Sequence, residues 1–313
     1  MKPEFKNEDL YCYVFNVELP KEGKKDSEFN PLFLATKCQL GKIKLAFWVP
    51  EKIGFDKDNK KTWPAKTGDF LRVSCVNFEK AKKEYEEKKS IALQGKYGSN
   101  FKHSVINQED VPEDIYNKIY VDRSNQIDVA KKSLLDFIKN DSNWTNKDLG
   151  KMLKDAIEKH SSFINAPAAV GHHHAYEGGL LAHSYEVNFL CNSIANACEK
   201  LYPESINRDV LNISSWLHDI GKTETYYLDK DGDPRIYGEK ESKINHILRG
   251  HSIFEKLAEK YNLESEFVEK VSHCILSHQD RIDWKSPVEP IDLEAIILAK
   301  ADKISSELAK NAE

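Results

Sequence analysis

The sequence predicts a two-domain protein in which a small β barrel precedes an all-α domain. Residues 11–94 contain short runs rich in aromatic and β-branched residues, some alternating with polar ones, whereas apolar residues recur at helical intervals in the second half. The composition shifts between about residues 100 and 125. We therefore expect domains at residues 1–106 and 107–313, the second including a helical linker to about residue 160.

Size and charge are those of a soluble globular protein. The chain has 313 residues, of which 40% are hydrophobic and 31% charged, enough to bury one large core or two ordinary ones. The formal net charge of −5 argues against unspecific electrostatic binding to nucleic acid. Any such binding would need a local basic groove.

Cysteine usage and the N-terminus predict a cytoplasmic protein. The six cysteines are thinly spread with no C-x-x-C spacing, which favours buried free thiols in a reducing compartment. Residues 1–10 carry charges and no apolar signal-peptide core, and no uninterrupted apolar run approaches the ~20 residues of a membrane span. We expect no membrane association, and the sequence leaves self-association open.

Five strands are expected in the first domain, at residues 11–17, 32–40, 43–49, 70–76 and 90–94. Gly41 and Lys42 mark a tight turn between the second and third, and Pro50 ends the third. The polar segment 51–67 and the charge run 80–89 are expected to be mostly loop. Five short strands with a longer insertion before the fourth fit a Greek-key barrel of the OB-fold type.

A barrel of this type is a candidate platform for single-stranded nucleic acid. Trp48 and Trp63 could stack on bases, and Lys44 and Arg72 could meet phosphates. Alternation places Trp48 on the face opposite Phe47, so that one of these two rings faces outward. The alternative is that the aromatic rings form the barrel core and the basic side chains are only solvated.

Helices follow in the second domain. Apolar spacing and capping residues predict them at about residues 127–138, 145–157, 179–201, 208–219, 247–261, 264–278 and 292–313. Residues 166–171 form a break, and residues 226–240 form a hairpin or loop.

Histidine is concentrated in this helical half, where nine of the 11 histidines lie between His172 and His278. His218 and Asp219 stand side by side just before Gly221, which can end a helix. Neighbouring helical residues point about 100° apart, so these two side chains do not share one helix face. They could still bind one ion together if other elements supply further ligands. The alternative is a helix end with a capping glycine and a histidine favoured by the helix dipole.

Further inward-facing histidines and a carboxylate supply those ligands. His183 lies on an apolar helical stripe, and Asp302 lies on a row of small and apolar residues where a carboxylate is costly unless paired or metal-bound. The candidate metal ligands come from several helices: His183, His218, Asp219, His251, His278 and Asp302. Imidazole and carboxylate without thiolate suit Mn, Fe, Co, Zn, Ni or Mg rather than a Cys-rich structural zinc site. Six ligands exceed the need of one ion, whereas two ions bridged by Asp219 could activate a water at a phosphoryl centre.

The motifs resemble those of the HD-domain metal-dependent phosphohydrolase superfamily. The pattern His183…His218-Asp219…Asp302 is similar to the superfamily signature, and residues 173–184, 217–222 and 275–278 narrow the resemblance. With a barrel in front, the chain resembles the YhaM-type 3′→5′ exoribonucleases, which join an OB-fold to an HD domain.

The resemblance implies a manganese-dependent exonuclease that acts on single-stranded nucleic acid, with RNA favoured over DNA. In such an enzyme one ion would be held by four of the candidates, His183, His218, Asp219 and Asp302. His251 and His278 would hold a second ion, with Asp219 bridging the two. The chain has Gln279 where the family often shows a second histidine, so the second ion is expected to be weaker or absent. His273 could compensate, although a histidine packed within its helix is the alternative.

Three further residues gain roles from the resemblance. Lys222 would meet a non-bridging phosphate oxygen, and His173 and His174 would lie near the scissile phosphate as phosphate contacts or proton donors. His172, His246 and His160 are expected to be structural or exposed.

Two other functions remain open on sequence grounds. One is an HD-type phosphohydrolase of small nucleotides, such as deoxynucleoside triphosphates or cyclic nucleotides, whose metal ligands would look the same. The other is a nucleic-acid-binding protein with a vestigial metal site, which the intact ligand set disfavours.

Overall fold

The structure is a computed structural model of the chain. It describes residues 9–18, 29–50, 65–66, 68–75, 83, 86–87, 92–96, 101–119, 124–170, 174–203, 205–230, 232–284 and 286–312. The chain divides into two compact units, Met1–Asp122 and Arg123–Glu313. The predicted boundary at residue 106 coincides with the end of the last strand of the first unit, and the segment after it groups with that unit. The roles assigned to the two domains stay predictions.

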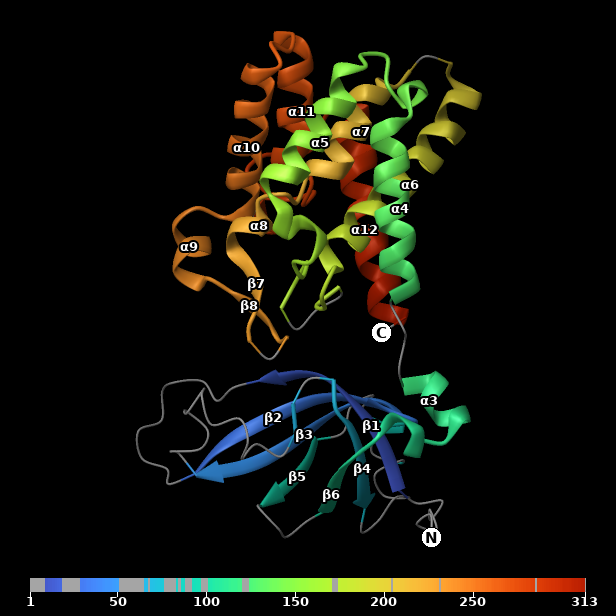
Figure 1. Cartoon of the computed structure of the whole chain (residues 1–313), viewed down its shortest axis with the longest axis vertical. Coiled ribbons are helices and arrows are strands. Elements are labelled where there is room, and N and C mark those ends of the chain that lie inside the picture. Colours follow the sequence, from blue (N-terminus) through green and yellow to red (C-terminus); the bar gives the residue numbers. More distant parts are fainter. Residues whose placement is uncertain are drawn as a thin grey trace. The chain divides into compact units, whose positions relative to one another are not determined.

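The first unit is a six-stranded sheet with the order β5-β3-β2-β1-β4-β6 (Figure 1). Its strands are β1 (Asp9–Glu18), β2 (Phe29–Cys38), β3 (Gly41–Pro50), β4 (Phe70–Cys75), β5 (Ala92–Lys96) and β6 (Phe101–Ile106). All neighbours pair antiparallel except β3 and β5, which run parallel. The five strands expected from the sequence are confirmed, and β6 is an addition.

Side-chain alternation builds the core of this sheet. In the β2–β3 ladder Leu34 pairs with Leu45, and both are fully buried together with Leu32 and Leu71. Phe47 is also buried, so its ring belongs to this core. The edge strands β5 and β6 contact each other, which shows that the sheet is curled. Among the described residues no ladder joins them, so the predicted OB-fold-like barrel is not confirmed.

A short helix packs against the sheet. The helix α3 (Glu113–Ile119) follows a single 3-10 turn and contacts β1 and β2. Ile119 and Val111 form a small second core with Tyr11 and Phe70.

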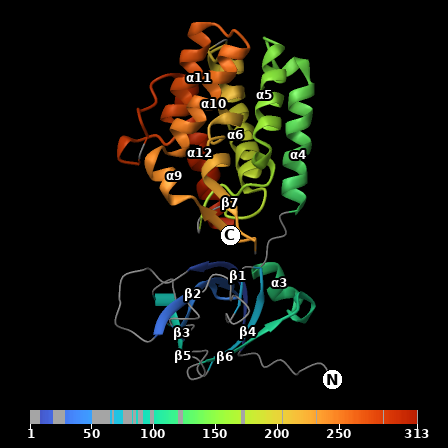
Figure 2. The ribbon, with the colours of Figure 1, turned by 60° about the vertical axis from the view of Figure 1, so that its left-hand side comes forward.

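The second unit is helical (Figure 2). Its longer helices are α4 (Ser124–Lys139), α5 (Asp148–Lys159), α6 (Gly179–Leu201), α7 (Arg208–Leu217), α10 (His246–Lys260), α11 (Ser265–Ser277) and α12 (Leu293–Ala312). Between α7 and α10 lie the short helices α8 (Lys222–Thr225) and α9 (Gly238–Lys243) and the hairpin β7 (Tyr226–Leu228) and β8 (Pro234–Ile236). Each of the seven predicted helices is present within a few residues of its expected bounds.

Helix α7 lies at the centre of the helical packing. It contacts α6, α11, α12 and α5, while α10 packs on α11 and α4 packs on α6. Trp216 of α7 is fully buried, and its ring lies 5.9 Å from that of Phe137. Asn207 caps the N-terminus of the helix, since its side-chain oxygen accepts a hydrogen bond from the Val210 amide at 3.1 Å. This packing fixes the end of α7, where His218 and Asp219 follow.

Two predictions from composition can be compared with the structure. All five cysteines whose side chains are described are free thiols, four of them buried, as expected: Cys12, Cys38, Cys191, Cys198 and Cys274. No described helix combines the length and apolarity that crossing a bilayer requires.

Gly221, two residues after Asp219, lies directly against the start of α10. A Cβ atom on Gly221 would lie 1.9 Å from the carbonyl oxygen of His246 and 2.6 Å from the amide nitrogen of Gly250. Both distances are far below van der Waals contact, so only glycine fits at position 221 without displacing α10.

We predict that Gly221→Ala destabilises the protein by about 1–3 kcal/mol, because the added methyl group overpacks a backbone contact. Thermal or urea unfolding measures this effect. Gly238→Ala is the matched control, since a Cβ atom there meets nothing within 4 Å. An unchanged unfolding midpoint for Gly221→Ala would show that α10 does not pack here as described.

Candidate metal centre

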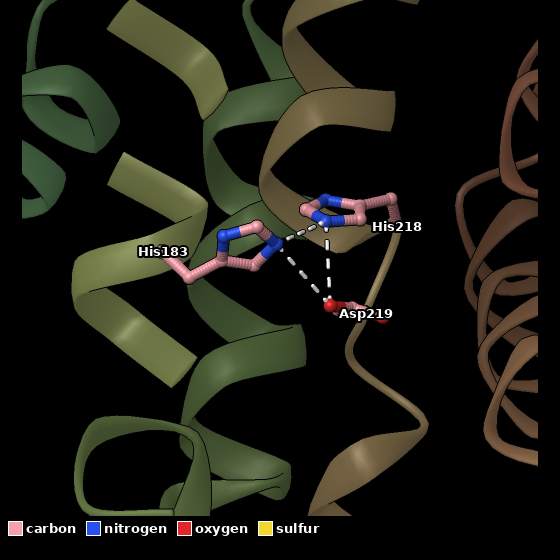
Figure 3. Close-up of side chains that lie close together, drawn as sticks. All are labelled: His183, His218 and Asp219. Carbon is pink, nitrogen blue, oxygen red and sulfur yellow. Dashed lines mark hydrogen bonds and ion pairs between the residues drawn. The ribbon is translucent and has the colours of Figure 1, made fainter. Parts of the chain in front are cut away.

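The first ligand group joins the ends of two helices. His183 lies on α6, and His218 caps the C-terminus of α7 with Asp219 next to it (Figure 3). The Nε2 atoms of the two histidines are 3.3 Å apart, and they lie 3.5 and 3.4 Å from Oδ2 of Asp219. All three side chains are buried. Asp302 on α12 adds a carboxylate, with its Oδ1 3.0 Å from Nε2 of His183.

A second group faces the other oxygen of the same carboxylate. Oδ1 of Asp219 lies 3.7 Å from Nε2 of His246 and 3.6 Å from Nε2 of His278. His246 opens α10, and His278 caps α11. Each trio places its ligand atoms within 4.8 Å of one another, as a metal site requires. Asp219 is therefore positioned to be shared between two groups.

The four imidazoles are oriented by their other ring nitrogen. Each Nδ1 lies beside an oxygen: the carbonyl of Ser215 for His218 (2.9 Å), the carbonyl of Ile275 for His278 (2.6 Å), Glu241 Oε1 for His246 (2.7 Å) and Ser305 Oγ for His183 (3.1 Å). A carbonyl or carboxylate can only accept, so Nδ1 donates and the lone pair is left on Nε2. This is the arrangement that prepares histidine to bind a metal through Nε2.

A chain of hydrogen bonds orients His183. The hydroxyl of Ser305 donates to Oε2 of Glu186 at 2.7 Å, so it accepts from Nδ1 of His183. The same Glu186 oxygen lies 3.1 Å from Nε2 of His174, whose ring centroid is 5.2 Å from that of His183. His174 is fully buried, with a φ of 56° in the left-handed region, which non-glycine residues rarely adopt. Such backbone conformations cluster at functional sites.

Burial and charge set the protonation of the centre. Burial lowers the pKa of His278 to about 4 and also lowers the pKa of His183, so the neutral imidazole is favoured at pH 7. Burial opposes a charge on His218 as well, but the Asp219 carboxylate outweighs it and raises the pKa of His218. Burial would raise the pKa of Asp219, yet Lys222 and His218 hold it well below its usual range.

The donor set fits a divalent cation. Oδ1 of Asp219 is buried and accepts no hydrogen bond from the described residues, although a buried carboxylate oxygen normally has a partner. The Nε2 atoms of His183 and His218 lie 3.3 Å apart, close enough for one cation to contact both. The carboxylates of Asp219 and Asp302 both lie in the centre, and the ammonium of Lys222 is paired with Asp219. Imidazole and carboxylate ligands suit divalent transition metals and Mg.

The structure brings together five of the six predicted metal ligands. His251 is the exception, because its Nδ1 lies 3.5 Å from Glu255 and the residue belongs to neither group. His246, which was expected to be structural, lies beside Asp219 in the second group instead. Residues five apart on a helix point about 140° apart, so only one of the two can face Asp219. Helical periodicity alone does not decide whether His246 or His251 faces Asp219, because this depends on how α10 packs against Gly221.

Other predicted site residues have different surroundings. The ammonium of Lys222 donates to Oδ2 of Asp219 at 2.6 Å, so it lies in the centre. His174 contacts Glu186 behind His183 rather than standing on an open surface. His173 and His172 lie outside the described residues. His273 accepts a hydrogen bond from the Ile291 amide at 3.0 Å.

The candidate nucleic-acid residues lie in the sheet unit. Lys44 on β3 has its ammonium 5.2 Å from the ring centroid of Phe33, and Arg72 on β4 forms an ion pair with Asp9 at 2.5 Å. Trp48 belongs to β3, but its side chain is not among those described, and Trp63 falls in a segment outside the described residues.

Comparison with known families defines the class of this centre. Residues 180–307 match the family model of the HD domain, from the start of α6 to α12. This stretch is similar to the HD domain over those residues, so the resemblance drawn from the motifs is confirmed. Residues 122–220 also match the TraI_2 model, described as "Putative helicase".

Relatives of known activity match about half of the chain. The 3′-5′ exoribonuclease YhaM of Listeria monocytogenes is 32% identical over 165 residues, which cover 52% of this chain and 50% of that protein. YhaM of Bacillus subtilis is 30% identical over 164 residues with the same coverage. The chain thus aligns with only half the length of these relatives. No solved structure matches the chain significantly.

We predict that His246→Ala lowers the manganese content of the loaded protein from about two ions per chain to about one, because it removes a ligand of the second group. Elemental analysis after loading and desalting measures this. His251→Ala, on the same helix, should retain both ions. Loss of an ion in His251→Ala but not in His246→Ala would contradict the assignment.

Metal affinity should fall as the pH is lowered. The neighbouring carboxylates raise the pKa of His218, so a proton competes with a cation for its Nε2 increasingly as the pH falls. We expect the apparent affinity for Mn²⁺ to drop about tenfold per pH unit for each proton displaced. Calorimetric titrations at pH 8, 7 and 6 measure the slope, and an affinity independent of pH would be inconsistent with these ligands.

Proposed function

We propose that the protein is a metal-dependent phosphodiester hydrolase, and that it acts as a 3′-5′ exonuclease on single-stranded nucleic acid, with RNA favoured. The observation that carries this proposal is the carboxylate of Asp219 shared by two imidazole pairs inside an HD domain. The exoribonuclease relatives support the substrate class. Manganese is the favoured metal, with Co, Fe, Ni, Zn and Mg as alternatives.

Different residues of the centre would bind the two ions and contact the phosphate. When bound, a pair of divalent cations supplies an activated water and neutralises charge on both the attacking and leaving oxygens of a phosphoryl group. His183, His218 and Asp302 would hold one ion, His246 and His278 the other, and Asp219 both. The ammonium of Lys222, kept charged by the neighbouring carboxylate although burial opposes the charge, would face a phosphate oxygen next to Asp219. No nucleophile from the protein is required.

We further propose that the sheet unit is an OB-type platform that holds the single strand. Its support is the strand order, in which β1 pairs with β2 and β4, and β3 runs parallel to β5. Contact between the edge strands β5 and β6 is consistent with a partly open barrel of this type. Lys44 beside the half-buried Phe33 supplies a cation next to an aromatic ring, the pairing that such platforms use.

We predict that Asp219→Ala abolishes hydrolysis, with a loss of at least about 1,000-fold in kcat, while the fold is retained. The reason is that this one substitution removes a ligand of both ions. The assay compares labelled single-stranded RNA, single-stranded DNA and deoxynucleoside triphosphates side by side, with circular dichroism to monitor folding. Asp136→Ala on the exposed side of α4 is the control.

Turnover by Asp219→Ala near the wild-type rate would refute the shared-carboxylate site. Hydrolysis of the triphosphates alone, with both oligonucleotides left intact, would favour the small-nucleotide alternative over the exonuclease.

A further inference from the structure

A pocket adjoins the metal centre. Its volume is about 230 Å³, and its lining includes His278 and Asp302 from the centre together with Gln279, Trp284, Lys303 and Ser306. Drug-sized ligands fill pockets of about 300–1,000 Å³, so this one suits a single small unit. A group bound in it would lie directly beside the metal ligands.

The distinctive residue of the pocket is Trp284. Its side chain is 46% exposed, although tryptophan is highly buried on average. The ammonium of Lys303 lies 4.8 Å from its ring centroid, and the guanidinium of Arg281 lies 5.4 Å from it. An exposed indole with a lysine ammonium beside it is a combination that can bind a nucleobase and its phosphate.

The loop that carries Trp284 is held in place. The amides of Trp284 and Ser286 both donate to the carbonyl of Arg281 at 3.1 Å, and the Ser286 hydroxyl donates to the carbonyl of Leu276 on α11. Arg281 forms two contacts of 2.8 Å with Asp283. Lys300 on α12 donates to Asp280 at 2.7 Å, so both flanking helices anchor the loop.

We propose that Trp284 forms a stacking subsite for the nucleobase next to the scissile phosphate, with Lys303 placed to meet a phosphate oxygen. This proposal rests on the proposed function and specifies how that site takes a nucleotide. Stacking is tolerant of base identity because every base has a π face, so the subsite binds any of the four bases. The pocket thus selects for a nucleotide over a bare sugar phosphate.

The test uses the full chain loaded with Mn²⁺ and RNA oligonucleotides ending in either an ordinary or an abasic 3′ nucleotide. The wild type should show a KM about tenfold higher for the abasic end, with kcat less affected. Trp284→Ala should raise KM about tenfold for the ordinary end and treat both ends alike. Trp284→Phe should restore most of the preference. Ile282→Ala is the matched control, since Ile282 is 63% exposed on the same 3-10 turn.

A wild-type KM in Trp284→Ala, or a preference for the ordinary end that survives in it, would overturn the subsite. If the wild type cleaves neither oligonucleotide, the exonuclease proposal fails, and binding then tests the subsite separately. Calorimetry should show adenosine 5′-monophosphate binding about tenfold more tightly than ribose 5-phosphate to the wild type, and equally to Trp284→Ala. Equal binding of the two ligands to the wild type would overturn the subsite even then.

Discussion

The buried carboxylate of Asp219 is the group on which the candidate metal centre depends. Two imidazole nitrogens face each of its oxygens, and the ammonium of Lys222 adds a single positive charge. Burying so many acceptors without a cation is costly, because lone pairs and a carboxylate have lost their water. A divalent cation at each oxygen of Asp219 would offset this cost. The arrangement therefore supports a metal site.

The surrounding fold serves to aim these groups. Backbone carbonyls near the ends of α7 and α11 orient His218 and His278, while Ser305 and Glu186 orient His183. The close contact of Gly221 with α10 brings His246 to the same carboxylate. Candidate ligands from α6, α10 and α12 and from the ends of α7 and α11 therefore converge through helix packing. A substitution at a contact between these helices would also displace the candidate ligands.

Much of this was predictable from the sequence, for identifiable reasons. The helix α6 was expected at its observed bounds because Gly178 and Gly179 precede a long apolar stripe, and His183 on that stripe had to face inward. The choice of His246 over His251 was not predictable, since it depends on the crossing of α10 and α8. The role of His174 depends on contacts with Glu186 and on a rare backbone conformation, neither of which a periodic pattern reports. The strand β6 is short and carries no alternation strong enough to identify it.

The most direct test of the account is the anomalous scattering of crystals of the protein soaked in Mn²⁺. The account predicts two peaks that share Asp219 as a ligand, one beside His183 and His218 and the other beside His246 and His278. Manganese bound elsewhere with no peak at Asp219, or ions held by His251 in place of His246, would contradict it.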